Sequence, residues 1–287
     1  MIAALPLPYP FELLFMQRAL LASLVVGIFA PMIGTFLVQK RMSLIGDGIG
    51  HIAFAGVGAG LLLLGAGGGP VWMALLFATV GALGIEWLRA RRKASGDLAL
   101  ALFFYSGIAL GVVLVSRAQG LGANILAYLF GQPLTASAQD VWVIVGLGIL
   151  IVTAMLGLRR VLFAVVTDED WSRVSGLPVS LVNNLLAVLT AFAVVAAMKI
   201  VGLLLVAAMM VLPVASAQLV ARSFWGTMRL SVTVSVGSVI LGLAASRIWN
   251  VAPGGTIVLI AAGVFAVTAA LTRRTGPRTS VAEDVTL

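Results

Sequence analysis

The sequence has no cysteine and few charged residues, and each absence limits what the chain can be. Without cysteine, disulfides and thiolate metal sites are excluded. Charged residues make up 10% of the 287 residues, whereas soluble domains carry about a quarter. Hydrophobic residues make up 61%, and the mean hydropathy is +1.15. Because so few polar side chains cannot cover a water-facing surface, the sequence predicts a polytopic membrane protein.

Catalytic motifs are missing as well. A phosphate-binding P-loop needs a lysine directly after glycine, and none of Lys40, Lys93 and Lys199 follows one. The single histidine excludes the H-E-x-x-H motif of zinc proteases, and no G-x-S-x-G occurs. We therefore expect neither an enzyme nor a permanently bound cofactor, and ATP hydrolysis would have to come from another protein.

The net charge of +8 lies in short connectors between apolar segments. No basic stripe interleaved with aromatics occurs, so nucleic acid is not an expected partner. Basic residues beside apolar spans are typical of cytoplasmic loops. The basic connectors are Lys40-Arg41, Arg89–Lys93, Arg159-Arg160, Arg222–Arg229 and Arg273–Arg278.

Apolar stretches long enough to cross about 30 Å of hydrocarbon recur along the chain. They predict an all-α transmembrane bundle of eight or nine helices in contact with membrane lipid. The count depends on Leu185–Met198, which is short and runs into the next stretch through Lys199. The expected spans are Leu13–Val38, Ser43–Leu64, Val71–Leu88, Leu98–Ser116, Val141–Leu158, Leu185–Met198, Val201–Ala221, Leu230–Ile248 and Thr256–Leu271.

The N-terminus lacks a basic region before its first apolar run, so no cleavable signal peptide is expected. Placing the basic connectors on the cytoplasmic side fits nine crossings that start outside and end inside. We expect one transmembrane domain at residues 1–272 and a disordered cytoplasmic tail at residues 273–287.

The connector at residues 159–183 differs from a simple turn. Asp168, Glu169 and Asp170 would favourably oppose the dipole of a short helix. The stop signal Gly176-Leu177-Pro178 would end that helix. Two interpretations remain: a solvated loop helix, or a docking element for a soluble partner.

The second span contains Asp47 and the only histidine, His51. Their spacing of four places both side chains on one helix face. A charged residue in a span is costly and usually faces a cavity or a partner, and carboxylate plus imidazole suits zinc, manganese or iron. Because a zinc site normally takes four ligands, a symmetric homodimer would be needed. Alternatively, Asp47 caps the helix or pairs with Arg41, and His51 is only hydrogen-bonded.

Small residues also mark the second span. Gly46/Gly50 and Gly56/Gly60 are small-xxx-small pairs that let helices approach closely, and plain helix packing explains most of them. Close packing around Asp47 and His51 is also what a passage between two helices would require. Glu86, near a span edge, is expected to reach the membrane interface.

Five segments, in this order along the chain, resemble the zinc/manganese permease family of ABC transporters, and most closely the zinc-uptake permeases of Gram-negative bacteria. The segments are RMSLIGDGIGHIAFAGVGAG at 41–60, LAYLFGQPL at 126–134, DEDWSRVSGLPV at 168–179, AMKIVGLLLVAAMMVLPVASA at 197–217 and VAPGGTIVLIAAGVF at 251–265. The sequence departs from the family at Gly48 and Gly50, where alanine and serine are frequent, and at Lys40, where arginine is frequent.

The resemblance implies a type II importer bundle in the bacterial cytoplasmic membrane. It implies a homodimer that works with two ATP-binding subunits and a periplasmic metal-binding protein. It places the metal-coordinating pair at Asp47 and His51, and the coupling helix that meets the ATPase at Asp168–Leu177. The expected ion is zinc, with manganese or iron as alternatives. A stand-alone secondary transporter or channel is the rival class, although the sequence shows no convincing internal repeat.

Overall fold

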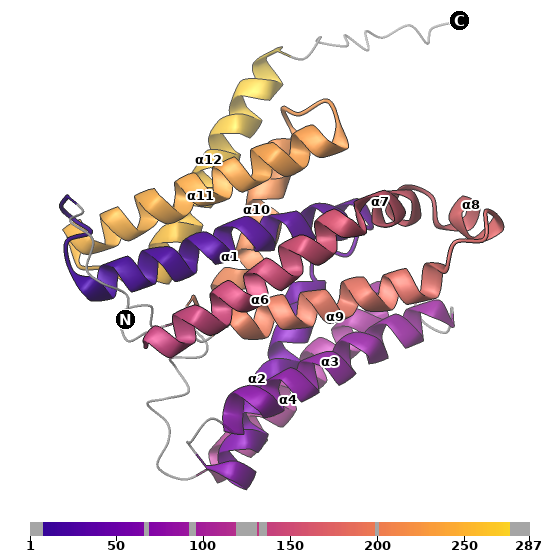
Figure 1. The fold of residues 1–287 in the computed structure, drawn as a ribbon, viewed down its shortest axis with the longest axis horizontal. Helices are drawn as coiled ribbons and strands as arrows, with labels where there is room; N and C mark the ends of the chain where they lie inside the picture. Colours follow the sequence, from indigo (N-terminus) through magenta and orange to yellow (C-terminus); the bar gives the residue numbers. More distant parts are fainter. Residues whose placement is uncertain are drawn as a thin grey trace, which may run out of the picture.

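The computed structural model describes residues 8–65, 69–91, 96–118, 131, 137–198 and 201–275. Over these residues the protein is helical and has no strand (Figure 1). The membrane-length helices are α1 (Leu14–Gln39), α2 (Ile45–Leu64), α3 (Gly69–Ala90), α4 (Gly96–Arg117), α6 (Ala138–Gly157), α9 (Val179–Met198), α11 (Phe224–Trp249) and α12 (Pro253–Thr275). The shorter helices are α7 (Arg159–Thr167), α8 (Glu169–Val174) and α10 (Leu203–Gln218).

Eight helices are long and apolar enough to cross a membrane, which makes the chain a multi-pass membrane protein. α10 has 16 residues and would span only about 24 Å. α9 begins next to α8, and Phe224 at the start of α11 contacts Phe163 of α7 at 5.0 Å between ring centroids. The chain must therefore return between α9 and α11, and α10 is the helix that makes this return.

The expected span at Leu185–Met198 was wrong at its start. α9 begins at Val179 and has 20 residues, because the polar Asn183 that interrupts the apolar pattern is buried inside the bundle. The connector before α9 is correspondingly shorter than expected and holds two helices. At the other end of α9, Lys199 lies outside the described residues, and Gly202 caps α10 with a φ of 90°.

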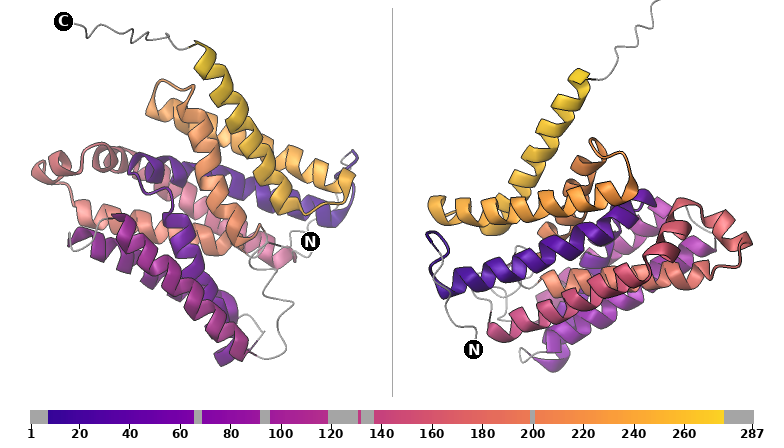
Figure 2. Two further views of the ribbon diagram at one scale, coloured as in Figure 1. Left: turned by 180° about the vertical axis from the view of Figure 1, so that it is seen from behind. Right: turned by 45° about the horizontal axis from the view of Figure 1, so that its top comes forward.

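The bundle has a buried centre formed by α1, α2, α9 and α10, while α4 and α12 lie toward its outside. α10 packs against α1, α2, α9, α11 and α12, so its short length is tolerated inside protein. Figure 2 shows α2, α3 and α4 as one group, and α10, α11 and α12 as another. α1, α6 and α9 lie between these groups (Figures 1 and 2).

Three of the predicted basic connectors, through Lys40, Arg89 and Arg222, lie at one end of the bundle. A cavity there is lined by Gln39 at the end of α1, Thr167 in α7 and Arg222 before α11. Lys40 and Arg89 both approach Glu169 of α8 at the same end. Under the positive-inside rule this end is cytoplasmic. α12 continues to Thr275, and the rest of the expected tail lies outside the described residues.

Candidate metal path and coupling segment

α2 is enclosed by other helices along most of its length. It packs against α3, α4, α9 and α10. From Ile45 to Leu61 every residue is buried except Asp47 and His51, which are half-buried. The two polar residues of this stretch therefore face the one side of α2 that the chain leaves partly open.

Both residues keep their polar groups available. Throughout the described part of the chain, no hydrogen bond or ion pair involves the side chain of Asp47 or His51, and Arg41 does not pair with Asp47. The His51 ring packs edge-on against Phe104 of α4, at 4.6 Å between centroids. The cap or ion pair considered as an alternative for Asp47 is therefore absent from the described residues.

α4 approaches the backbone of α2 closely at His51. A Cβ added to Gly107 would lie 3.0 Å from the carbonyl carbon of His51 and 2.9 Å from the nitrogen of Ile52. This contact fixes the position of the α2 backbone from which the imidazole projects. A bulkier residue at Gly107 would push the histidine away from α4.

The described residues of one chain do not supply a complete metal site. Among the described residues, no group of three or more His, Cys, Asp or Glu side chains is placed to hold a metal ion. Asp47 and His51 together provide two ligands, and transition-metal sites in proteins usually have four or more. A metal site at this pair would therefore need further ligands.

The glycines of α2 pack inside the subunit. An added Cβ at Gly46 would lie 3.2 Å from the sulfur of Met210 in α10, and Gly50 is in direct contact with Leu203 of α10. Gly56 faces α3, where an added Cβ would lie 2.7 Å from the Cα of Ala74. Gly60 is buried. Gly46, Gly50 and Gly56 therefore each lie against another helix of the same chain.

The predicted short helix after residue 168 is present as α8. Asp168 is its N-cap and accepts a hydrogen bond from the Trp171 nitrogen at 2.9 Å, while Glu169 and Asp170 occupy the first turn. Gly176 has a φ of 78°, a left-handed conformation that glycine adopts without strain. The helix therefore begins at the predicted acids but ends at Val174, before the predicted end at Leu177, and Gly176 turns the chain after it.

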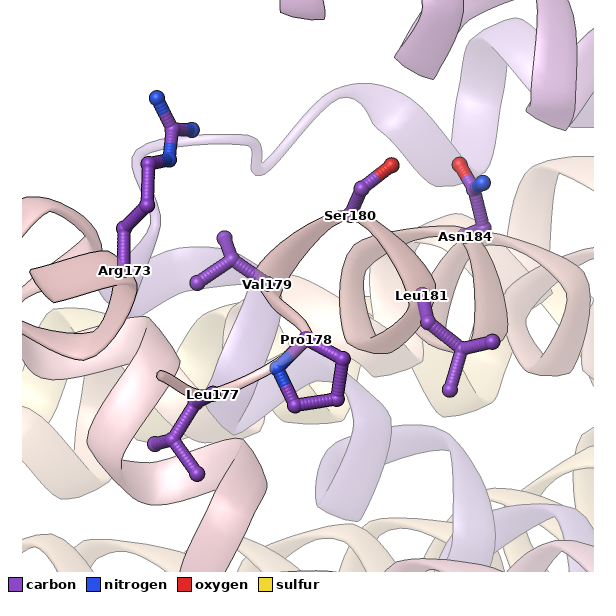
Figure 3. A pocket seen from close by; sticks show the side chains of 7 residues that line it. All are labelled: Arg173, Leu177, Pro178, Val179, Ser180, Leu181 and Asn184. Atoms are coloured by element: carbon purple, nitrogen blue, oxygen red, sulfur yellow. The ribbon is translucent and has the colours of Figure 1, made fainter. Parts of the chain in front are cut away.

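The outer surface of α8 and the start of α9 is open. Trp171 is 65% exposed and Val174 is 89% exposed. Beside them lies a cavity of about 560 Å³ whose lining includes Leu177 and Pro178, the last two residues of the predicted segment (Figure 3). The other lining residues are Arg173, Val179, Ser180, Leu181 and Asn184.

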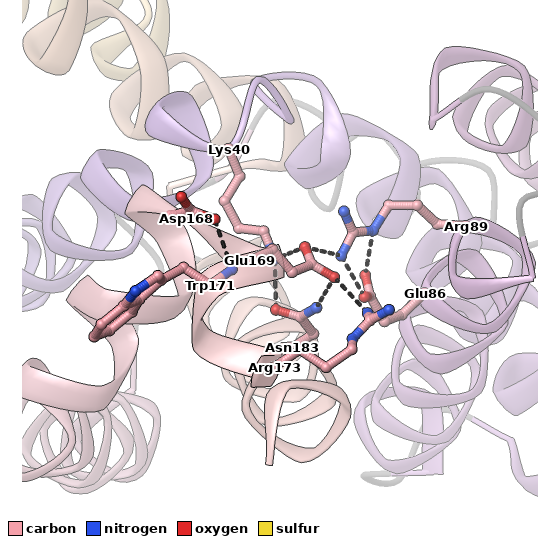
Figure 4. Close-up of polar contacts among 8 residues, drawn as sticks. All are labelled: Lys40, Glu86, Arg89, Asp168, Glu169, Trp171, Arg173 and Asn183. Carbon is pink, nitrogen blue, oxygen red and sulfur yellow. Dashed lines mark hydrogen bonds and ion pairs between the residues drawn. The ribbon is translucent and has the colours of Figure 1, made fainter. Parts of the chain in front are cut away.

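The inner side of α8 is held to the bundle through Glu169 (Figure 4). Its carboxylate lies 3.4 Å from a guanidinium nitrogen of Arg89 in α3 and 3.7 Å from the Lys40 ammonium after α1. It also accepts a hydrogen bond at 3.3 Å from the amide of Asn183 in α9, and Lys40 donates to the oxygen of that amide. Arg173 of α8 adds an ion pair at 3.4 Å. Three membrane helices thus meet at one carboxylate.

Glu86 completes this cluster and corrects an expectation. Its side chain is 6% exposed and forms an ion pair with Arg89 at 2.6 Å, so it does not reach toward the membrane interface. Lys40 stands where arginine is frequent in the family, and its side chain is 6% exposed. Burial, followed by repulsion from Arg89, lowers the pKa of Lys40 to about 8, and attraction to Glu86 and Glu169 offsets only part of this shift.

Sequence reasoning did not predict Lys40, Glu86, Arg89 and Asn183 as partners of the coupling segment. Lys40 and Asn183 are separated by 143 positions, and no local pattern brings them together. The available signal was the alternation of charge: acids in the connector and in α3, and bases at the ends of α1 and α3.

Comparison with known proteins agrees with this architecture. Residues 12–272 match the ABC 3 transport family. The manganese transport system membrane protein MntC of Halalkalibacterium halodurans is 32% identical over 88% of this chain and 85% of that protein. The manganese import system permease protein ScaB of Streptococcus parasanguinis is 33% identical over 88% of each chain.

A solved structure, PsaBC from Streptococcus pneumoniae in complex with Fab, contains a chain with a TM-score of 0.79 to this one. It is 32% identical, over 90% of this chain and 91% of that chain. The family match at residues 12–272 covers the helices that carry Asp47, His51 and α8, and membership in an ABC transport family disfavours the rival stand-alone transporter or channel. From its sequence match, its helical bundle and its relatives, the chain belongs to the ABC 3 transport family, the membrane-spanning permeases of metal ABC transporters.

Proposed function

We propose that two copies of this chain form the path of an ATP-driven importer for a divalent transition-metal ion, and that the ion passes between the Asp47 and His51 pairs. The observation that carries this proposal is the opening on α2: in its buried stretch only these two residues are partly open. An ionisable pair in a transmembrane helix, with no hydrogen-bond or ion-pair partner among the described residues, is typical of a transport path.

The proposed homodimer follows from the ligand count. A second copy related by a two-fold axis would add a second Asp47 and His51 opposite the first pair. Two carboxylates and two imidazoles would then surround one ion, and water would complete its shell. A transported ion must also be released, so a looser ligand set than that of a structural zinc site is suitable.

Manganese is the ion that the relatives favour, since MntC and ScaB are both named for it. The zinc preference suggested by the sequence has no such support. The ligand chemistry admits both ions, because carboxylate and imidazole bind either, and selectivity depends on geometry and availability. Manganese is therefore the first candidate ion and zinc the second.

ATP hydrolysis by the ATP-binding subunits would drive transport through α8. Its exposed Trp171 and Val174 and the adjoining cavity offer an apolar surface to the ATP-binding subunits. Movement of α8 would reach α2 through Glu169 and Lys40, because Lys40 begins the tight turn that leads into α2 at Ile45. A metal-binding protein would deliver ions at the opposite end of the bundle.

ATP-dependent uptake in proteoliposomes tests this function. The importer, assembled with its ATP-binding subunits and binding protein, should accumulate manganese in preference to zinc when both are supplied. Asp47→Asn and His51→Ala should abolish uptake, while Glu12→Gln, which changes an exposed acid near the N-terminus, should not affect it. Normal uptake by His51→Ala would refute the proposed path. Uptake of zinc alone at a rate equal to that of manganese would refute the preference for manganese.

A further inference from the structure

A third cavity, of about 470 Å³, lies where the cytoplasmic ends of α6 and α11 approach each other, next to α7. Its lining combines three arginines with apolar side chains. Arg159 and Arg160 begin α7, and Arg229 lies in the first turns of α11. Leu156, Trp225 and Met228 complete the lining, which contains no acidic residue.

The three guanidinium groups have no counter-ion among the described residues. Across the part of the chain that the structure describes, the ion pairs all involve Glu86 or Glu169, and none includes Arg159, Arg160 or Arg229. All three arginines are exposed. Positive charge of this density, gathered in one cavity, favours an anionic ligand that presents several oxygen acceptors.

The cavity lies at the level of the lipid headgroups. Arg159 follows α6 after the single residue Leu158, so it stands at the cytoplasmic end of a membrane span. Trp225 is half-buried at the same level, as tryptophan commonly is at a membrane–water interface. Its ring stacks on Phe163 at 6.1 Å and meets Phe224 edge-on at 5.2 Å, so the wall of the cavity is fixed by an aromatic cluster.

An apolar surface leads from the cavity toward the membrane interior. Leu156, in the cavity lining, is 48% exposed. Further along α6, Leu150 is 50% exposed and Ile149 is 60% exposed. A ligand with a charged head and hydrocarbon chains could therefore place its head among the arginines and a chain along α6, whereas a free anion would leave this apolar surface unused.

We propose that this cavity is a binding site for the headgroup of an anionic phospholipid, with its phosphate between Arg159, Arg160 and Arg229 and an acyl chain along α6. Basic pockets between transmembrane helices on the cytoplasmic side recognise such headgroups. The bound lipid would neutralise charge at the joint between α6 and α7. Because α7 leads directly into α8, the lipid would also steady the coupling segment.

Native mass spectrometry of the assembled importer tests the proposal. Phosphatidylglycerol is titrated against phosphatidylcholine with the same acyl chains, in the presence and absence of excess inorganic phosphate. The variants are Arg159→Gln and Arg229→Gln, singly and together. Arg247→Gln is the matched control, because it removes an exposed arginine from the opposite end of the same helix. Arg229→Lys keeps the charge and serves if the glutamine variants fail to assemble.

Each arginine near the membrane surface contributes about fivefold in affinity for anionic lipid. We expect each single glutamine variant to lose about fivefold in phosphatidylglycerol retention and the pair about twenty-five-fold, while Arg247→Gln and Arg229→Lys retain most of it. Three results would overturn the site: equal retention by the double variant and Arg247→Gln, equal binding of phosphatidylcholine, or no retained lipid because another subunit covers the cavity. Displacement by inorganic phosphate would also overturn it, since the site would then hold a free anion.

Discussion

Replacing Glu169 with glutamine should loosen α8 from the bundle. The substitution keeps an acceptor for Asn183 but removes the charge that Lys40 and Arg89 share at 3.7 and 3.4 Å. At these distances an effective dielectric constant of about 20 gives about 5 kcal/mol for each pair. The carboxylate is 31% exposed and Lys40 has lost most of its hydration, so the net loss should be about 1–2 kcal/mol. Arg89 remains paired with Glu86.

A double-mutant cycle with Lys40→Met isolates the electrostatic part. Glu169→Gln alone leaves Lys40 buried near Arg89 without its acid, whereas the double variant removes the unpaired charge. The double variant should therefore be more stable than the sum of the single effects predicts, by about 1 kcal/mol. For a chain of this size each kcal/mol corresponds to about 2–4 °C in Tm.

Thermal unfolding of the purified permease in detergent at pH 7 measures these effects, with Glu12→Gln as the control acid. The ATPase activity of the assembled importer should also respond less to metal-loaded binding protein in Glu169→Gln. Equal Tm values for Glu169→Gln and Glu12→Gln, or strictly additive single effects, would refute the role of Glu169.

Three other perturbations follow from the same contacts. The pKa of Lys40 is lowered from 10.5 to about 8, so between these two pH values the unfolded chain binds more protons than the folded chain. The free energy of unfolding should therefore rise with pH in this range in the wild type but not in Lys40→Met, and unfolding measured as a function of pH tests this. Gly34→Ala should lower the free energy of unfolding by about 3 kcal/mol, because its Cβ would overlap the backbone carbonyl of Met210. Gly146→Ala, whose Cβ would have no atom within 4 Å, should be neutral or stabilising by up to about 1 kcal/mol. Equal Tm values for the two variants would contradict this. Val174→Asp should weaken assembly with the ATP-binding subunits and leave the permease Tm unchanged, and unchanged co-purification would disprove docking at this residue.

The features that sequence patterns predicted are local ones. Long apolar runs predicted the spans, because each must satisfy its backbone in lipid as a helix. Acids followed by Gly176 and Pro178 predicted α8, since capping and chain reversal depend on a few adjacent residues. The spacing of Asp47 and His51 placed them on one helix face, and both are partly open.

The features that were missed depend on which helices become neighbours. The partners of Glu169 come from the ends of α1 and α3 and from α9, and only the folded bundle brings them together. The start of α9 was missed because the sequence alone does not distinguish the buried Asn183 from an exposed asparagine. Its hydrogen-bond partner Glu169 is known only from the folded bundle. Likewise, Gly46 and Gly50 predicted a close helix contact without identifying α10 as the partner.

The most direct test of the account is uptake by a mixed dimer with one wild-type and one His51→Ala copy, purified through two different tags and reconstituted with the other subunits. If one ion is held between the Asp47 and His51 pairs of both copies, a single substitution should remove most of the ATP-dependent manganese uptake. A mixed dimer that transports at about half the wild-type rate would show that each copy has its own path, and would contradict the shared site.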